Sequence, residues 1–216
     1  TPASVIPAGL PGAPTALNTT PGDGSVVLTF TAPVNDGGNP IVGYRVETST
    51  DGVNFSVAVP NSNTVVPAVA VTGLTNGTTY SFRVSAVNTI GFGAASTTAQ
   101  STPATVPNAP VVTATVSGNA QVTVTWNAPT SNGGSAVSSY AVDRSTDGIN
   151  WVPAASVSAS TTSSTITGLA NGTMYLFRVS ASNGVGASVF STPVAGLPAG
   201  VPSVPRAFVA VGSDSS

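Results

Sequence analysis

The sequence contains no cysteine, no histidine and no lysine, and only 6% of its 216 residues are charged. Without histidine or cysteine, neither a Ser-His-Asp triad nor a Cys-His pair can be assembled, and without lysine Schiff-base chemistry is excluded. Paired carboxylates are the catalytic arrangement left open, but Asp51 and Asp147 fall in predicted turns. We therefore expect no enzyme, no catalytic residue and no cofactor.

The same scarcity of charge restricts the ligands and partners of the chain. With five arginines, seven acidic residues and a net charge of −2, it has no basic stripe to neutralise phosphates, so nucleic acid is not an expected partner. The acidic residues form no D-x-D run and thiolates are absent, so no metal site is expected. No apolar run approaches the roughly 18 residues of a membrane-spanning helix, so no membrane span is expected.

A long internal repeat is the main feature that the sequence does contain. Residues 35–55, NDGGNPIVGYRVETSTDGVNF, return as residues 131–151, SNGGSAVSSYAVDRSTDGINW. Residues 71–88, VTGLTNGTTYSFRVSAVN, return as residues 166–183, ITGLANGTMYLFRVSASN. A period of about 96 residues lets each unit bury a core of its own, so the repeat predicts two domains in series.

Proline-rich junctions set the expected domain boundaries. We expect residues 1–12 to be a linker or the tail of a preceding repeat, and residues 13–103 and 104–198 to be the two domains. Residues 199–216 then correspond to the first strand of a third, incomplete repeat. Because proline fixes φ and favours extended chain, the junctions are expected to be semi-rigid connectors.

Within each unit, apolar residues alternate with polar ones, which is typical of half-buried strands. Val26, Leu28 and Phe30 show this pattern in the first unit, and it recurs in the second. Asp51-Gly52 and Asp147-Gly148 lie between alternating runs and predict two-residue hairpin turns. No stretch has helical periodicity, so each unit is predicted to be a two-sheet antiparallel sandwich of seven short strands.

Four features, in the same order in both units, resemble the fibronectin type III family over nearly the whole chain. They are an aromatic residue on the second strand, a tyrosine on the third, a leucine followed six residues later by a corner tyrosine, and an asparagine that ends the sixth strand. The residues are Phe30, Tyr44, Leu74, Tyr80 and Asn88 in the first unit, and Trp126, Tyr140, Leu169, Tyr175 and Asn183 in the second.

This resemblance implies an all-β fold, with two tandem seven-stranded immunoglobulin-like β-sandwiches and a partial third unit. It also implies structural roles for the matching residues. The aromatic on the second strand is expected to fill the space between the sheets, and the corner tyrosine hydroxyl to satisfy a backbone group. The structural core is therefore expected to include Phe30, Tyr44, Leu74, Tyr80, Trp126, Tyr140, Leu169 and Tyr175.

The remaining charged and aromatic residues are assigned to the surface. The strand pattern predicts outward ion pairs between Arg83 and Glu47 and between Arg178 and Asp143. Phe92, Trp151 and Phe190 are the aromatic candidates for stacking on sugars. Trp151 and its counterpart Phe55 are interpreted instead as covers for the edge of each sandwich.

The composition, poor in charge and rich in Thr, Ser, Val, Ala and Gly, resembles fibronectin type III arrays of bacterial secreted and cell-surface proteins. That resemblance implies a non-enzymatic extracellular array: a spacer, a stalk, or the subunit of a surface filament or sheath. Expected partners are other protein chains, including self-assembly through strand pairing, and weak contacts with glycans. The alternatives are an accessory module of a polysaccharide-degrading enzyme and a decoration of a phage tail.

Overall fold

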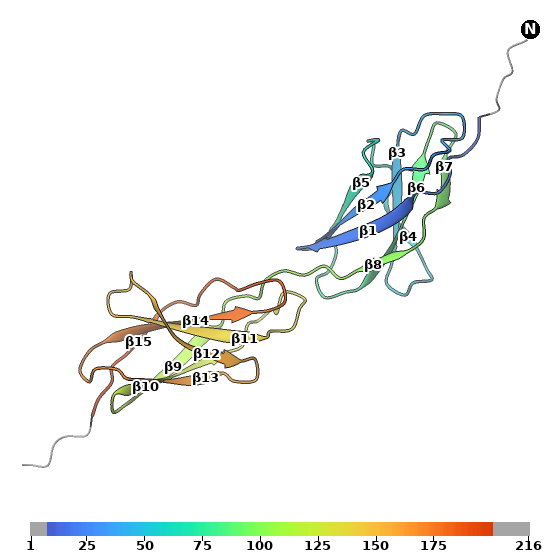
Figure 1. Cartoon of the computed structure of the whole chain (residues 1–216). Coiled ribbons are helices and arrows are strands. Elements are labelled where there is room, and N and C mark those ends of the chain that lie inside the picture. Colours follow the sequence, from blue (N-terminus) through green and yellow to red (C-terminus); the bar gives the residue numbers. More distant parts are fainter. Residues whose placement is uncertain (1–7, 201–216) are drawn as a thin grey trace, which may run out of the picture. The chain divides into compact units, whose positions relative to one another are not determined.

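The computed structural model describes residues 8–200, and strands, turns and loops make up this part of the chain (Figure 1). The chain divides into two compact units. The predicted strand of a third repeat, at residues 199–216, lies almost wholly outside the described residues. Most of the predicted leading segment, residues 1–12, also lies outside them.

The first sandwich consists of two antiparallel sheets. One has the strand order β1-β2-β5, and the other has the order β4-β3-β6-β7, with β8 also paired to β6. Because β7 and β8 both pair with β6, they are two halves of the predicted seventh strand. The strands are β1 (Thr15–Gly22), β2 (Ser25–Thr31), β3 (Gly43–Ser49), β4 (Ser56–Val59), β5 (Ala68–Thr72), β6 (Tyr80–Val87), β7 (Phe92–Ala95) and β8 (Ala99–Ser101).

The second sandwich repeats this connectivity, with the strand orders β13-β10-β9 and β12-β11-β14-β15. The predicted fold class, all-β with two tandem immunoglobulin-like sandwiches, is therefore confirmed. The strands are β9 (Val111–Gly118), β10 (Gln121–Asn127), β11 (Ser139–Ser145), β12 (Val152–Ser158), β13 (Ser163–Thr167), β14 (Tyr175–Ser182) and β15 (Val194–Gly196).

Alternation along the strands builds the core of each sandwich. On β2, Val26, Leu28 and Phe30 are buried, whereas the residues between them are exposed. The Phe30 ring meets Tyr44 of the opposite sheet edge to face, with 4.6 Å between ring centroids. Trp126 and Tyr140 form the same kind of contact in the second sandwich, at 5.5 Å. These aromatic pairs join the two sheets and remove large apolar areas from water.

The connections after β3 and β11 differ from the predicted two-residue turns, and that prediction was wrong. They span residues 50–55 and 146–151. The Asp51 carboxylate organises the first of them by accepting hydrogen bonds from the Ser49 hydroxyl and from two backbone N–H groups of the loop. Asp147 does the same in the second. Hydrogen bonds to the aspartate side chain take the place of the backbone hydrogen bonds of a tight turn. A longer loop can therefore connect the two strands.

Each sandwich holds the chain segment that enters it. In the first, the Gly9 N–H donates to the Gly37 carbonyl at 2.7 Å, and the Asn88 Nδ2 donates to the Gly9 carbonyl at 2.8 Å. An equivalent pair of hydrogen bonds, with the Asn183 side chain as one donor, holds Thr105 in the second sandwich. The asparagine that ends the sixth strand therefore fastens the incoming linker.

The first sandwich also holds the segment that leaves it. The Gly77 N–H donates to the Pro103 carbonyl at 2.8 Å, and the Ala104 N–H donates to the Gly22 carbonyl at 3.2 Å. Ala104 is thus fastened to the first sandwich and the next residue, Thr105, to the second. The junction contains no residue that is free of both.

Candidate interaction surface

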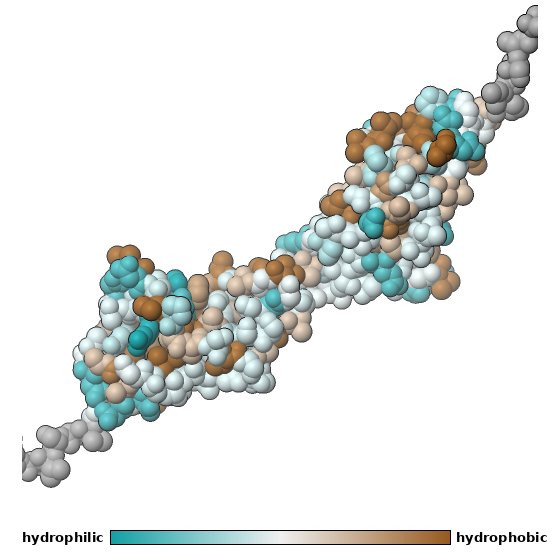
Figure 2. Space-filling model, in the orientation of Figure 1, coloured by the Kyte–Doolittle hydropathy of each residue, from teal (hydrophilic) through white to brown (hydrophobic). Residues whose placement is uncertain are grey.

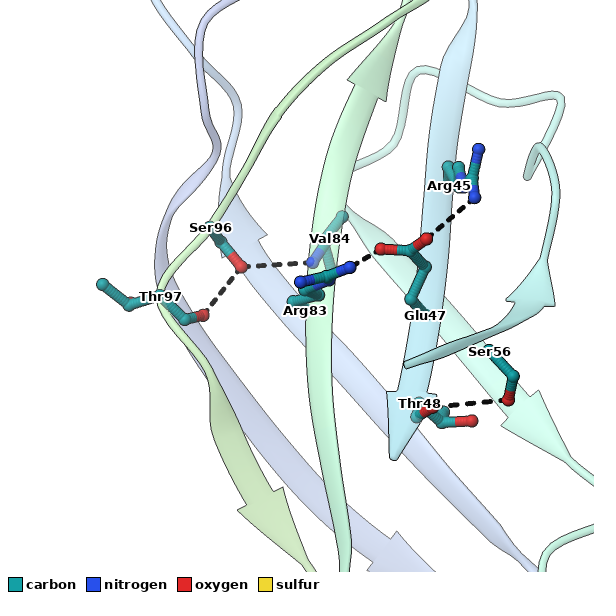
Figure 3. Close-up of polar contacts among 8 residues, drawn as sticks. All are labelled: Arg45, Glu47, Thr48, Ser56, Arg83, Val84, Ser96 and Thr97. Carbon is teal, nitrogen blue, oxygen red and sulfur yellow. Dashed lines mark hydrogen bonds and ion pairs between the residues drawn. The ribbon is translucent and has the colours of Figure 1, made fainter. Parts of the chain in front are cut away.

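The sheet β4-β3-β6-β7 carries a row of charged and aromatic side chains on its outer face. On β3, Tyr44 and Val46 are buried in the core, so Arg45 and Glu47 project from the opposite face. The neighbouring strand β6 places Arg83 directly across from Glu47. Figure 3 shows the Glu47 carboxylate between the two arginines.

The Glu47 carboxylate joins both arginines. Its Oε1 lies 2.7 Å from Arg45 Nη2, and its Oε2 lies 2.6 Å from Arg83 Nε. The predicted ion pair between Arg83 and Glu47 is therefore confirmed, and Arg45 is a second partner that the sequence did not indicate. Burial raises the pKa of Glu47, but the hydrogen bond and charge of Arg83, together with Arg45, bring that pKa below its ordinary value.

Aromatic rings cover both arginines at the ends of the row. The Arg45 Cζ lies 4.0 Å from the centroid of the Phe92 ring, and the Arg83 Cζ lies 4.2 Å from that of Phe55. The contacts link Phe92, Arg45, Glu47, Arg83 and Phe55 in this order, and we call these five residues the stacked row. Each cation–π contact at such a site contributes about 0.5–1 kcal/mol. These contacts therefore hold five side chains in place on the solvent-facing side of the sheet.

The second sandwich has a shorter version of this arrangement. Arg178 donates from Nη2 and Nε to the same carboxylate oxygen of Asp143, at 2.9 and 3.2 Å, which confirms the second predicted ion pair. The Arg178 Cζ also lies 4.1 Å from the Trp151 ring and 3.9 Å from the Phe190 ring. One guanidinium is therefore enclosed by two aromatic rings and a carboxylate.

The second sandwich lacks both residues of one cation–π contact of the stacked row. Aligned on the third-strand tyrosine, Arg45 corresponds to Ala141. Aligned on the asparagine that ends the sixth strand, Phe92 corresponds to Ala187. Both partners of one cation–π contact are therefore absent together from the second sandwich.

The aromatic candidates for sugar stacking all contact an arginine. Phe92, Trp151 and Phe190 each have a guanidinium against one ring face, and so does Phe55. Phe92 stays half exposed, with 50% of its surface accessible. The sequence did not reveal these contacts, because each aromatic residue lies far along the chain from its arginine, and only the strand register brings them together.

The residues expected in the structural core occupy two kinds of position. The corner tyrosines lie at the start of the sixth strand, where the Tyr80 and Tyr175 hydroxyls accept hydrogen bonds from the backbone N–H groups of Thr75 and Ala170, at 3.1 and 3.2 Å. Five are buried, namely Phe30, Tyr44, Trp126, Tyr140 and Leu169. Three are partly buried, namely Leu74, Tyr80 and Tyr175.

Large hydrophobic side chains are exposed at one end of the first sandwich. The connections that precede β1, β3 and β7 meet at this end, and Figure 2 shows brown, hydrophobic residues gathered there. They include Leu10, Val34, Val42, Ile90 and Phe92, each with at least 41% of its surface accessible. Exposed apolar clusters of this kind are typical of surfaces that contact other proteins.

Residues 8–200 contain no cluster of three or more acidic, histidine or cysteine side chains that could hold a metal ion. Within the same range there is no helix long and apolar enough to cross a membrane. The candidate interaction surface consists of the arginine, carboxylate and aromatic groups of the stacked row, together with the apolar end of the first sandwich. Such groups can bind and orient a partner.

Two antiparallel sandwiches in series, each with a corner tyrosine and an asparagine that fastens the incoming linker, define a tandem array of immunoglobulin-like domains. The model of the fibronectin type III domain matches residues 12–102 and 106–196. The chain belongs to the fibronectin type III family.

The chain is similar to segments of several much longer proteins. It is 32% identical over 195 residues to protein sidekick-1 of Gallus gallus, covering 87% of this chain and 9% of that protein. It is 32% identical over 190 residues to endoglucanase B of Cellulomonas fimi, covering 82% of this chain and 17% of that protein. A Kelch domain-containing protein of Saccharolobus solfataricus is 42% identical over 91 residues, which are 42% of this chain and 12% of that protein.

Among solved structures, the chain is similar to the crystal structure of chicken CNTN1 FN1-FN3 domains. The sequence identity is 21% and the TM-score is 0.45. The match covers 91% of this chain and 70% of that one.

Proposed function

We propose that the chain is a non-enzymatic, extracellular structural and interaction array, which acts as a spacer or stalk or as the subunit of a surface filament or sheath. The observation that carries this proposal is the anchored junction. Ala104 is fastened to the first sandwich and Thr105 to the second, so no unanchored segment separates the two domains along the chain. A chain of domains joined in this way can hold its ends apart, as a spacer requires.

The stacked row and the apolar end of the first sandwich support a role in binding other protein chains. The row presents ordered arginines beside aromatic rings, and arginine and aromatic residues are enriched at protein interfaces. Phe92 belongs to both features, because it stacks on Arg45 and is half exposed. The low charge of the chain also gives weak protection against association between copies.

Electron microscopy of the full-length protein, as its source produces it, tests this proposal. Isolated rods support the spacer or stalk, and regular filaments support the filament subunit. Compact particles in which the array folds back on neighbouring domains contradict both.

The second candidate is an accessory module of a polysaccharide-degrading enzyme. The specific observation in its favour is the similarity to endoglucanase B of Cellulomonas fimi over 82% of this chain. Retention on insoluble cellulose or chitin, lost in Trp151→Ala, would support it. The stacking of Trp151 on Arg178 leaves only one face of the indole for a sugar, so we expect no retention.

A further inference from the structure

A hollow of about 290 Å³ opens at one end of the second sandwich. It lies where β11 ends, beside the loop to β12 and beside the corner that leads into β14. Its lining includes Arg144, Asn150, Val152, Gly168 and Tyr175. This volume is at the lower end of the range of about 300–1,000 Å³ for ligand pockets, so it suits a ligand the size of one sugar residue.

Arg144 differs from the other arginines of residues 8–200 in having no ion-pair partner within that range. Arg45 and Arg83 share Glu47, and Arg178 binds Asp143. The Arg144 guanidinium instead lies 5.8 Å from the centroid of the Tyr175 ring. In a chain with so few charges, an arginine that lines a hollow and forms no ion pair keeps its N–H donors for a ligand.

The position of Arg144 on its strand explains why the group faces the hollow. Tyr140 and Val142 are buried in the core, and Arg144 continues the same face of β11 by period two. The equivalent residue of the first sandwich is Thr48. The cation is therefore specific to the second sandwich, and a threonine at this position is compatible with the fold.

The two acidic residues nearest to Arg144 in the sequence, Asp143 and Asp147, are engaged elsewhere. Asp143 binds Arg178. The Asp147 carboxylate accepts hydrogen bonds from Ser145, Ile149 and Asn150 within its own loop. Asn150, which lines the hollow, uses its Nδ2 for that contact, so its Oδ1 remains an acceptor for a ligand. The site thus combines a fork of N–H donors, an amide acceptor and the apolar surfaces of Tyr175 and Val152.

We propose that this hollow binds a carboxylate-bearing sugar, such as a hexuronate residue of an acidic polysaccharide. The guanidinium of Arg144 pairs with the carboxylate in a bidentate geometry. The Asn150 amide oxygen accepts a hydrogen bond from a ring hydroxyl, and the C–H face of the sugar packs on Tyr175. An acidic peptide offers the same carboxylate without the hydroxylated ring. This inference does not depend on the spacer role of the array.

Amide shifts in a ¹H–¹⁵N NMR titration of the 216-residue chain with sodium glucuronate test the proposal. We expect saturable shifts of the amides of residues 144–150, Gly168 and Tyr175, and at least a tenfold weaker affinity in Arg144→Thr. Equal concentrations of glucose and of sodium chloride are expected to cause no such shifts. Thr48→Ser, at the equivalent position of the first sandwich, is the matched control and leaves the affinity unchanged.

Three outcomes would overturn this assignment. The first is that sodium chloride reproduces the shifts, and the second is that Arg144→Thr binds glucuronate as the parent does. The third is that N-acetylaspartate amide binds as tightly as glucuronate, which would assign the hollow to an acidic peptide. An unchanged tryptophan fluorescence transition in urea verifies that Arg144→Thr is folded, because both tryptophans, Trp126 and Trp151, belong to the second sandwich.

Discussion

Ala120 occupies in the β9–β10 turn the place that Gly24 occupies in the β1–β2 turn, and both have a positive φ, 52° and 55°. In each turn the backbone N–H of this residue donates to the Oδ1 of a corner asparagine, Asn76 or Asn171, at 2.8 Å. A left-handed conformation costs a residue with a Cβ about 1–2 kcal/mol, and glycine adopts it freely. The second sandwich therefore retains strain that the first avoids.

Ala120→Gly should stabilise the second sandwich by roughly 0.5–1 kcal/mol, because the relief of strain exceeds the entropy that glycine adds to the unfolded chain. Urea unfolding followed by tryptophan fluorescence reports this sandwich alone. We expect a higher midpoint with an unchanged slope. Gly24→Ala, the matched change in the first sandwich, should leave the tryptophan transition where it is. A lower midpoint for Ala120→Gly would contradict the strain argument.

Tyr175→Phe should lower the stability of the second sandwich by about 0.5–1.5 kcal/mol. The hydroxyl accepts a hydrogen bond from the Ala170 N–H at 3.2 Å, and the variant leaves that donor without it. The same fluorescence measurement applies, with Tyr80→Phe as the control in the first sandwich. An unchanged midpoint would mean that water replaces the hydroxyl at no cost.

Arg178→Gln should destabilise the second sandwich by about 1.5–3 kcal/mol, the value of hydrogen bonds to charged groups. The change removes two hydrogen bonds to Asp143, which is only 8% exposed, and both aromatic stacks. Asp143→Asn in the same background should recover part of the loss, because no unpaired carboxylate then remains buried. If the double variant is as unstable as the sum of the single variants, the ion pair is not coupled.

Stability should fall as the pH drops below about 4, the ordinary pKa of aspartate. Hydrogen bonds from the side chain and backbone of Asn150, from Ile149 and from Ser145 lower the pKa of Asp147. A carboxyl whose pKa is lower in the folded state contributes stability above its unfolded pKa, and loses that contribution as the pH falls toward the folded pKa.

Asp147→Asn should therefore weaken the dependence of the tryptophan transition on pH below 4. Asp51→Asn, in the first sandwich, should leave that dependence unchanged, although the Ser49 hydroxyl, Val53 and Asn54 lower the pKa of Asp51 in the same way. Parallel pH profiles for Asp147→Asn and the parent chain would show that this loop does not control acid stability.

Much of the fold could be predicted because periodicity and the internal repeat are local signals. Alternation at Val26, Leu28 and Phe30 indicates a strand whichever partner it finds, and two similar units reinforce each other. The partner of Arg83 could also be predicted, since facing residues on adjacent strands are set by the register.

The rest depended on contacts between distant residues. Arg45 and Phe92 are brought together by the pairing of β3, β6 and β7, and nothing in either local segment indicates the stack. The turn prediction at Asp51-Gly52 was wrong for a related reason. The dipeptide pattern has no information on how many donors surround the Asp51 carboxylate, and these donors fix the length of the loop.

Amide hydrogen exchange at Ala104 and Thr105 of the 216-residue chain tests the anchored junction most directly. The account predicts slow exchange at both amides, because the Ala104 N–H donates to the Gly22 carbonyl and the Thr105 N–H donates to the Gly133 carbonyl. Exchange of both amides as fast as in an unstructured peptide would contradict the account, since the linker would then be anchored to neither sandwich.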